Sequence, residues 1–384
     1  MASTPRYPSL FQINTRVWLQ RLSREAGKPI TLADIDDATI AGFAEQGFDW
    51  IWLLSVWQTG AAGRAVSRGE PQWRAEFKAV LPDLTEDDIC GSGFAITAYT
   101  VSEALGGETV LMRFRERLAK RGIKLMLDFV PNHTAPDHPW VKAHPDYYVE
   151  GSEKAVAGAP QNYLRVDTDR GLRMLAYGRD PNFPGWPDTL QLNYANPELQ
   201  AARIDELIAI AGKCDGVRCD MAMLLLPEIF QRTWGLTPEP FWPRATAAVR
   251  QKHPAFTFMA EVYWDLEWTL QQQGFDYCYD KDFTTAYGRA MSGRSAVTCS
   301  PASTIRISSR DFLKITTSRA PRPNFPGRST RRQRSSPFCR LACAFSIRAS
   351  SRARRCGYRR ISAAVRSSRL IRTPLRSTPS CCRC

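Results

Sequence analysis

Strand-like and helix-like runs alternate through the first 283 residues, and this alternation constrains the fold more than any other feature of the chain. Short apolar runs bounded by Gly or charged residues are typical of buried strands, and stretches with apolar residues at helical spacing lie between them. Strands that alternate with helices predict a parallel sheet, and this series is typical of a (β/α)8 barrel. Six strands are predicted, at residues 10–19, 49–54, 125–133, 216–221, 258–264 and 274–279.

The predicted helices have recognisable starts and stops. Thr31 and Asp34 have the spacing of a capping pair before an acidic helix start, and Gly122 ends a helix that begins at Glu108. The remaining predicted helices are at 197–213, 240–252 and 266–273. The alternation stops between residues 133 and 196, where Pro, Gly, Asp and aromatic residues are frequent. A structureless loop of that length is uncommon inside a compact domain, so the segment is predicted to be a small inserted subdomain.

The composition changes at Thr284. Residues 284–384 contain 22 Arg, one Lys and one acidic residue, a net charge of +22, whereas the first 283 residues have a net charge of −8. Seven of the eleven cysteines lie in the second part, which has no hydrophobic periodicity. Such a segment cannot bury enough apolar surface to offset the loss of chain entropy, so residues 284–384 are predicted to be a disordered tail.

Two explanations of this basic tail are open. One is a disordered arm that binds nucleic acid. The other, which we favour, is a frameshift near residue 284, because an excess of Arg, Ser, Pro, Ala and Cys is typical of GC-rich coding sequence read in the wrong frame. With one base restored and third bases chosen freely, the codons of residues 314–318 read Glu-Asn-His-Asp-Glu. Under this explanation, no binding of nucleic acid is expected.

Arg218 and Asp220 form the first candidate for chemistry. They lie two residues apart on a predicted strand, so both side chains point to one face. A guanidinium beside a carboxylate is expected to lower its pKa, and an anionic Asp at the end of a strand suits attack on a sugar carbon. The structural alternative is a pair that only links two strands. The residues on two other strands favour the catalytic interpretation.

Those two strands carry polar residues in a matching order. Residues 125–133 read Leu-Met-Leu-Asp-Phe-Val-Pro-Asn-His, and residues 258–264 read Phe-Met-Ala-Glu-Val-Tyr-Trp. With residues 216–221, they resemble the first three signature regions of the alpha-amylase family, glycoside hydrolase family 13, and the resemblance covers about residues 9–283. The restored Glu-Asn-His-Asp-Glu run resembles the fourth region. The resemblance implies a partial barrel at 1–132 and 197–283, subdomain B at 133–196 and an out-of-frame tail at 284–384.

The resemblance also implies a retaining mechanism. Asp220 matches the nucleophile of the family, and Glu261 matches the general acid/base. The aromatic neighbours of Glu261 are expected to supply the apolar surroundings that keep such a residue protonated: Phe258, Tyr263 and Trp264.

Substrate-binding roles follow from the same resemblance. Arg218 matches the residue that orients the nucleophile, and His133 the residue that hydrogen-bonds the sugar. Phe94 stands where the family often has a Tyr that stacks on the sugar. Trp264 is a further candidate.

The resemblance adds two more residues, Asp128 and Asn132, to the substrate-binding candidates. Asp128 matches a position with a mostly structural role, which we favour over direct catalysis. Asn132 matches a calcium ligand of some relatives, but no oxygen-rich loop supports calcium here. The cysteines before the tail lack metal-ligand spacing, so no cofactor and no metal is expected.

These observations define three classes of function. The first is a glycosidase acting on an alpha-glucan, with a glucan transferase or a trehalose-type isomerase as variants. The second is a sugar-binding pseudoenzyme, and the third is a nucleic-acid-binding protein that uses the tail. The chain as written is expected to be inactive, because residues 315–317 are Ile, Thr and Thr where the fourth region has its carboxylate.

Location and assembly are less constrained. Residues 1–10 lack a basic-then-apolar signal pattern, and no run approaches the 18 apolar residues of a membrane span. A cytoplasmic protein without membrane contact is therefore expected. The oligomeric state is left open.

Overall fold

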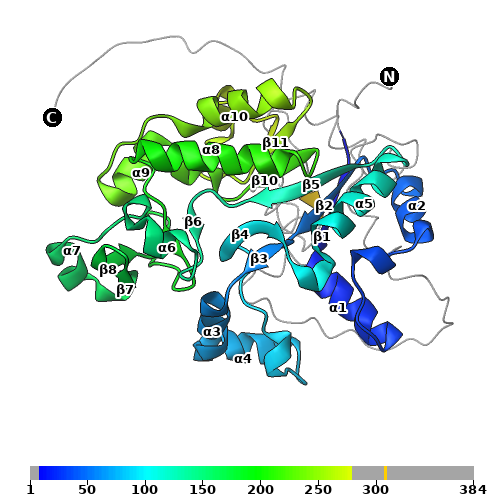
Figure 1. Cartoon of the computed structure of the whole chain (residues 1–384), viewed down its shortest axis with the longest axis horizontal. Helices are drawn as coiled ribbons and strands as arrows, with labels where there is room; N and C mark the ends of the chain where they lie inside the picture. The colour runs from blue at the N-terminus through cyan, green and yellow to red at the C-terminus, as the bar shows by residue number, and fades with distance from the viewer. Residues whose placement is uncertain (1–7, 279–306, 309–384) are drawn as a thin grey trace, which may run out of the picture.

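The computed structural model describes residues 8–278 and 307–308 (Figure 1). A seven-stranded parallel sheet lies at its centre, in the order β12-β11-β10-β5-β2-β1-β13. Its strands are β1 (Leu10–Asn14), β2 (Trp50–Leu54), β5 (Lys124–Phe129), β10 (Gly216–Cys219), β11 (Thr257–Ala260), β12 (Tyr277–Cys278) and β13 (Ile307–Ser308). Six of these strands lie side by side in the order in which they occur along the chain: β1, β2, β5, β10, β11 and β12. They form a curled half-barrel, which confirms the predicted incomplete (β/α)8 barrel.

One edge of this sheet differs from expectation. An incomplete barrel of six strands predicts that its first strand has no outer neighbour, but β13 pairs in parallel with β1, Leu10 with Ile307 and Phe11 with Ser308. An edge strand presents unpaired N–H and C=O groups, and a short extended segment satisfies some of them. The other predictions for residues 284–384, including disorder and the frameshift, lie outside the described residues.

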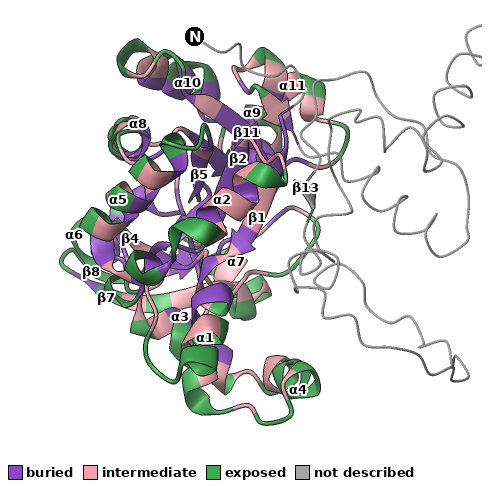
Figure 2. Cartoon of the chain, turned by 90° about the vertical axis from the view of Figure 1, so that its right-hand side faces the viewer, coloured by how far each residue is buried: buried purple, intermediate pink, exposed green. Residues whose placement is uncertain are grey.

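Helices join successive strands of the sheet. They are α1 (Thr15–Ala26), α2 (Asp37–Glu45), α5 (Gly107–Ala119), α8 (Pro197–Ala211), α9 (Pro227–Trp234), α10 (Phe241–Lys252) and α11 (Glu267–Gln272). Figure 2 shows β2, β5 and β11 as buried strands, whereas the helices carry exposed residues on their outer faces. None of the helices in the described residues has the length and apolar character needed to cross a membrane.

The first strand is shorter than its apolar run predicts. Residues 10–19 were expected to be one strand, but β1 ends at Asn14 and α1 begins at Thr15. The Asn14 side chain accepts a hydrogen bond from the Val17 N–H, which satisfies an otherwise unpaired helix donor. The Thr31–Asp34 capping box is present, but it caps a short 3-10 helix, Leu32–Asp34. The residues of α9 were not predicted to be helical.

Two long segments lie outside the main sheet. The segment between β2 and α5 forms two antiparallel strands with two helices between them: β3 (Trp57–Thr59), α3 (Ala61–Gly69), α4 (Pro71–Val80) and β4 (Ile96–Val101). Residues 133–196, predicted to be an inserted subdomain, form short elements at the left of Figure 1: β6 (His133–Thr134), α6 (Trp140–Ala143), α7 (Glu153–Gly158), β7 (Tyr163–Thr168), β8 (Gly171–Ala176) and β9 (Leu190–Gln191). β6 pairs with β9 and β7 with β8, both antiparallel.

Candidate active site

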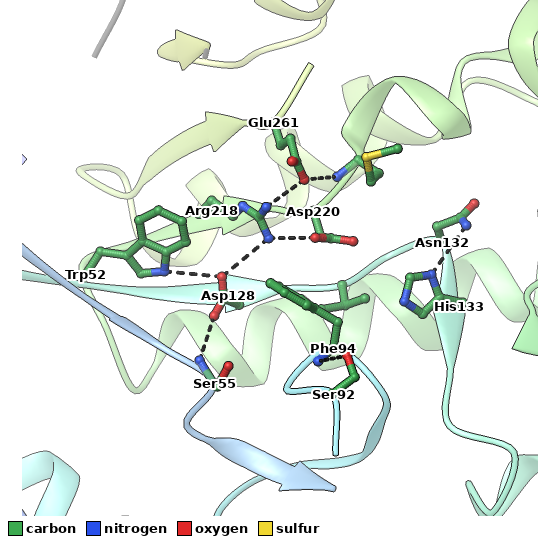
Figure 3. A network of polar contacts seen from close by, with 12 residues as sticks. Trp52, Ser55, Ser92, Phe94, Asp128, Asn132, His133, Arg218, Asp220 and Glu261 are labelled. Atoms are coloured by element: carbon green, nitrogen blue, oxygen red, sulfur yellow. Dashed lines mark hydrogen bonds and ion pairs between the residues drawn. The ribbon is translucent and has the colours of Figure 1, made fainter. Parts of the chain in front are cut away.

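Three neighbouring strands bring the predicted acidic residues to one edge of the sheet. Asp128 lies on β5, Asp220 directly follows β10, and Glu261 directly follows β11. Arg218 on β10 pairs in register with Asp128. Because parallel strands end at the same edge, side chains separated in sequence come together there (Figure 3).

The Arg218 guanidinium is the centre of this cluster. Its Nη1 lies 2.6 Å from Asp220 Oδ1 and 3.6 Å from Asp128 Oδ1, and its Nη2 lies 2.6 Å from Glu261 Oε2. All four side chains are buried. A single cation thus contacts three carboxylates, an arrangement that Figure 3 shows directly.

Two aromatic rings contact the same guanidinium. The Arg218 guanidinium carbon lies 5.4 Å from the centre of the Trp52 ring and 5.1 Å from that of Phe94. These are cation–π distances, and burial strengthens such contacts. The Phe94 ring, predicted to stack on a sugar, therefore also contacts the cation of the cluster.

Asp128 is held by the elements beside it. Its Oδ1 accepts from the Trp52 indole N–H (3.2 Å), and its Oδ2 accepts from the backbone N–H of Ser55 (3.1 Å). The Trp57 indole N–H donates to the Asp128 backbone carbonyl (2.7 Å). Burial raises the pKa of Asp128 to about 6, while Arg218 opposes the shift. These contacts tie β5 to β2, as a structural residue would.

The pKa of Asp220 moves in the direction opposite to the expectation. Burial raises it to about 7; the Arg218 guanidinium opposes this shift, and the carboxylates of Glu261 and Asp128 add to it. The prediction of a lowered pKa is therefore wrong. The guanidinium acts as expected, but the loss of solvation is larger.

Glu261 has polar partners rather than the apolar surroundings that its sequence neighbours suggested. Its Oε2 accepts from the Met221 N–H (3.0 Å) as well as from Arg218, and its Oε1 accepts from the Tyr263 hydroxyl (2.6 Å). Met221 has a φ of 43°, a strained left-handed conformation for a residue with a side chain. The backbone at the end of β10 is thus shaped to reach this carboxylate.

Trp264 stands apart from the Arg218 cluster. Its side chain is 38% exposed, and its ring lies 5.5 Å from the Arg232 guanidinium. The structure therefore shows no contact between Trp264 and the acidic residues, and its role in substrate binding stays a prediction.

Asn132 directly precedes β6 and His133 is its first residue, and both lie beside the cluster (Figure 3). Both are buried. Asn132 Nδ2 lies 3.4 Å from His133 Nδ1. The Trp186 ring packs against the imidazole of His133, with 5.5 Å between the two ring centres. Burial and the Arg203 charge lower the pKa of His133 to about 3. The backbone carbonyl of Phe94 opposes both effects, and Nε2 has no hydrogen-bond partner within the described residues.

Metal ligands are not gathered in the part of the chain that the structure describes. No group of three or more His, Cys, Asp or Glu side chains there has an arrangement that could hold a metal ion. Asn132 matches the position of a calcium ligand in some relatives. Its Oδ1 accepts a hydrogen bond from the Gln191 side-chain amide here (3.0 Å). The expectation that the protein needs no calcium stays a prediction.

Three residues whose side chains contact the candidate residues were missed from the sequence: Trp52, Trp57 and Gln191. Tyr263 was expected to supply apolar surroundings to Glu261, but its hydroxyl donates a hydrogen bond instead. Tyr263 follows Glu261 by two residues, the spacing that places two side chains on one face of an extended chain, so a local signal existed. Gln191 lies far from Asn132 in sequence and carries no local signal.

The family model "Alpha amylase, catalytic domain" matches residues 45–273. The chain is 25% identical over 224 residues to an alpha-1,4-glucan:maltose-1-phosphate maltosyltransferase of Bifidobacterium longum, covering 57% of this chain and 24% of that protein. It is 33% identical over 156 residues to an alpha-glucosidase of Culex pipiens, covering 38% and 25%. The chain thus spans about a quarter of the length of these curated relatives.

A solved structure shows the same fold. The crystal structure of an alpha-amylase from Lactobacillus plantarum superposes with a TM-score of 0.51 at 24% identity, covering 76% of this chain and 57% of that chain. The family model covers more than half of the present sequence, and the matched residues contain β5, β10 and β11 with their acidic side chains. The chain therefore belongs to the alpha-amylase catalytic-domain family.

Proposed function

We propose that this chain carries the site of a retaining enzyme that acts on the alpha-glucosidic bonds of a glucan. The observation that supports this most is the shared contact of Asp220 and Glu261 with one guanidinium, that of Arg218. Two carboxylates that contact one guanidinium are held close together. Retaining glycosidases need such a pair on the two sides of the scissile bond.

Each carboxylate has its own step in this mechanism. Asp220 attacks the anomeric carbon, the bond to the leaving oxygen breaks, and Glu261 donates a proton to that oxygen. Glu261 then takes a proton from water or from an acceptor hydroxyl, whose oxygen displaces Asp220. Water gives hydrolysis, and a sugar hydroxyl gives transfer. The Tyr263 hydroxyl and the Met221 N–H hold Glu261 in place through both steps.

The choice between hydrolysis and transfer is not fixed by this pair. One relative is named a maltosyltransferase and another an alpha-glucosidase. A trehalose-type isomerase uses the same two carboxylates, so the donor and acceptor subsites decide the outcome. We therefore propose the alpha-glucan class of substrate without a linkage.

The 384-residue chain is proposed to be inactive, because residues 315–317 lack the third carboxylate of the family. The test compares this protein with one made after restoring a single base near codon 284, using maltotriose as substrate. We expect turnover only from the restored protein, and its loss in the restored Asp220→Asn variant. The matched control, Asp265→Asn, changes an exposed acid beyond the cluster and should keep activity. Turnover by the 384-residue protein that Asp220→Asn abolishes would refute the proposed inactivity.

A sugar-binding pseudoenzyme is the second candidate. The contact that favours it is the 2.6 Å ion pair between Arg218 and Glu261. This ion pair engages an oxygen of the carboxyl group that would have to donate the proton. Titration of the restored protein with maltotriose in a calorimeter separates the two functions. Binding without turnover would select the pseudoenzyme, and turnover would exclude it.

A further inference from the structure

The Nε2 atom of His133 is buried and makes no hydrogen bond within the described residues. A neutral imidazole carries its proton on one ring nitrogen only, so Nε2 is either a donor or an acceptor. The contact at the other nitrogen, Nδ1, decides which. That contact comes from Asn132, at 3.4 Å.

Gln191 fixes the orientation of the Asn132 amide. The Gln191 Nε2 lies 3.0 Å from the Asn132 backbone oxygen, 3.0 Å from Asn132 Oδ1 and 3.1 Å from the Leu192 backbone oxygen. Three acceptors converge on this atom, while the Gln191 Oε1 is buried with no partner in the described residues. Turning the Gln191 amide over would place an oxygen against three oxygens. The network therefore sets its orientation.

The orientation of Asn132 follows from that of Gln191. Because the Gln191 amide donates to Oδ1, the Nδ2 group of Asn132 is left facing His133 Nδ1. An N–H donor that faces Nδ1 requires a lone pair on that nitrogen, so the proton of a neutral ring must sit on Nε2.

We propose that Gln191 is a positioning residue that acts through Asn132 to hold His133 in the Nε2–H tautomer, presenting a hydrogen-bond donor to a sugar hydroxyl. The tautomer itself follows from the contacts within this chain. Only the identity of the acceptor, a hydroxyl of an alpha-glucan, rests on the proposed function.

The ring stays neutral in this arrangement. Burial and the positive charge of Arg203 lower the pKa of His133 to about 3, so the imidazole carries one proton at neutral pH. A single proton makes the choice of nitrogen meaningful, since a doubly protonated ring would donate from both.

The test measures the tautomer directly, in the 384-residue protein labelled with ¹⁵N. The chain has four histidines, and the His133→Gln variant assigns the ring signals of His133 by their loss. A protonated ring nitrogen and a bare one have well-separated ¹⁵N shifts. We expect a protonated Nε2 and a bare Nδ1 at pH 7.5, and a proton on Nδ1 in this wild-type protein overturns the proposal.

The Gln191→Glu variant tests the relay. A carboxylate cannot donate to Asn132 Oδ1, so the Asn132 amide turns over, its oxygen faces Nδ1, and the proton moves to Nδ1. Gln200→Glu is the matched control, because Gln200 is also buried and its Nε2 also donates to two backbone oxygens, those of Tyr194 and Glu239. The control should keep the Nε2–H tautomer. An unchanged tautomer in a folded Gln191→Glu protein contradicts the relay.

Asn132→Asp provides a second route if Gln191→Glu does not fold. One carboxylate oxygen then faces Nδ1 while the other keeps the hydrogen bond from Gln191, so a proton on Nδ1 is expected. Retention of a bare Nδ1 in this variant would rule out control by Asn132.

Sugar binding gives an independent readout. Titration of the 384-residue protein and its Gln191→Glu variant with maltotriose should show roughly three- to tenfold weaker binding in the variant, the effect of one lost hydrogen bond. Equal affinities would contradict the proposed role of the donor. If neither protein binds maltotriose while the tautomers behave as expected, the sugar hydroxyl is contradicted as the acceptor in this chain, the relay stands, and the proposed function is decided separately by the restored protein.

Discussion

The structure contains two buried arginines with opposite surroundings. Arg203 on α8 contacts one carboxylate, Glu206 (2.5 Å), together with the neutral Val130 carbonyl (2.6 Å) and the Tyr99 hydroxyl (3.1 Å). Arg218 on β10 contacts three carboxylates. Both side chains also lie against two aromatic rings.

The difference separates a structural cation from a reactive cluster. One carboxylate and neutral oxygens balance the charge of Arg203, which fixes the end of β5 through Val130. The charge of Arg218 is outnumbered, and the pKa values of Asp220 and Asp128 lie above their ordinary values mainly because of burial. Buried groups with perturbed pKa values and a specific charge partner are frequent at functional sites. The following experiments test this contrast.

Removing the Arg218 cation should have the largest effect on stability. In Arg218→Met, three buried carboxylates lose their only cationic partner among the described residues, which should cost about 3–5 kcal/mol of unfolding free energy at pH 7.5. The loss should shrink at pH 5, where the carboxyl groups of Asp220 and Asp128, with pKa values of about 7 and 6, become protonated. Urea denaturation at both pH values measures it. A pH-independent loss would mean that charge imbalance is not its cause.

Removing Arg203 should cost less. In Arg203→Met, the Val130 carbonyl keeps its contact with Tyr99, and one carboxylate rather than three loses its partner. We expect a loss of about 2–3 kcal/mol in urea denaturation, with a weaker pH dependence than that of Arg218→Met. A loss as large and as pH-dependent as that of Arg218→Met would remove the distinction between the two sites.

Neutralising Asp220 should stabilise the protein at high pH. Its folded-state pKa is about 7, above the ordinary 3.8, so its contribution to stability is fully present below about pH 3.8 and is lost as pH rises through 7. Asp220→Asn should therefore raise the unfolding free energy by on the order of 1 kcal/mol at pH 8 and by little at pH 4. Urea denaturation across this range measures the difference curve.

Two histidines act in the opposite direction and provide the control. The pKa values of His133 and His138 are lowered by burial from 6.5 to about 3, so their contribution is present above pH 6.5 and is lost as pH falls. The wild-type protein and the Asp220→Asn variant share this effect, so it cancels when the unfolding free energy of one is subtracted from that of the other. A difference curve that is flat with pH would mean that the Asp220 carboxyl is ionised throughout.

The aromatic contact of Arg218 should have the smallest effect. Phe94→Leu removes one ring face from the guanidinium and should cost about 0.5–1 kcal/mol beyond the loss of apolar area. The measurement is a double-mutant cycle with Arg218→Met, in which the interaction energy isolates the contact. A coupling energy near zero would show that Phe94 only packs against its neighbours.

The sequence located the acids and one of their partners, Arg218, but not the others. The strands that carry Asp128, Asp220 and Glu261 were predicted from short apolar runs, and the structure places them side by side. The sequence could not give the sign of the Asp220 pKa shift, because burial depends on residues from every surrounding element. It also gave no sign of the pairing of β1 with β13, which depends on an open sheet edge rather than on a local pattern.

What the sequence by itself determined is local: the order of the strands, the shared face of Arg218 and Asp220, and the family to which the three motifs belong. The first two follow from covalent spacing and from the period of two along a strand, whereas the family follows from the resemblance of the three motifs. The tertiary structure alone decided that Arg218 also holds Glu261, 43 residues away, and that Gln191 orients Asn132, 59 residues away. Those pairings depend on how strands and inserted segments are brought side by side, and burial then sets the energies that spacing along the chain cannot.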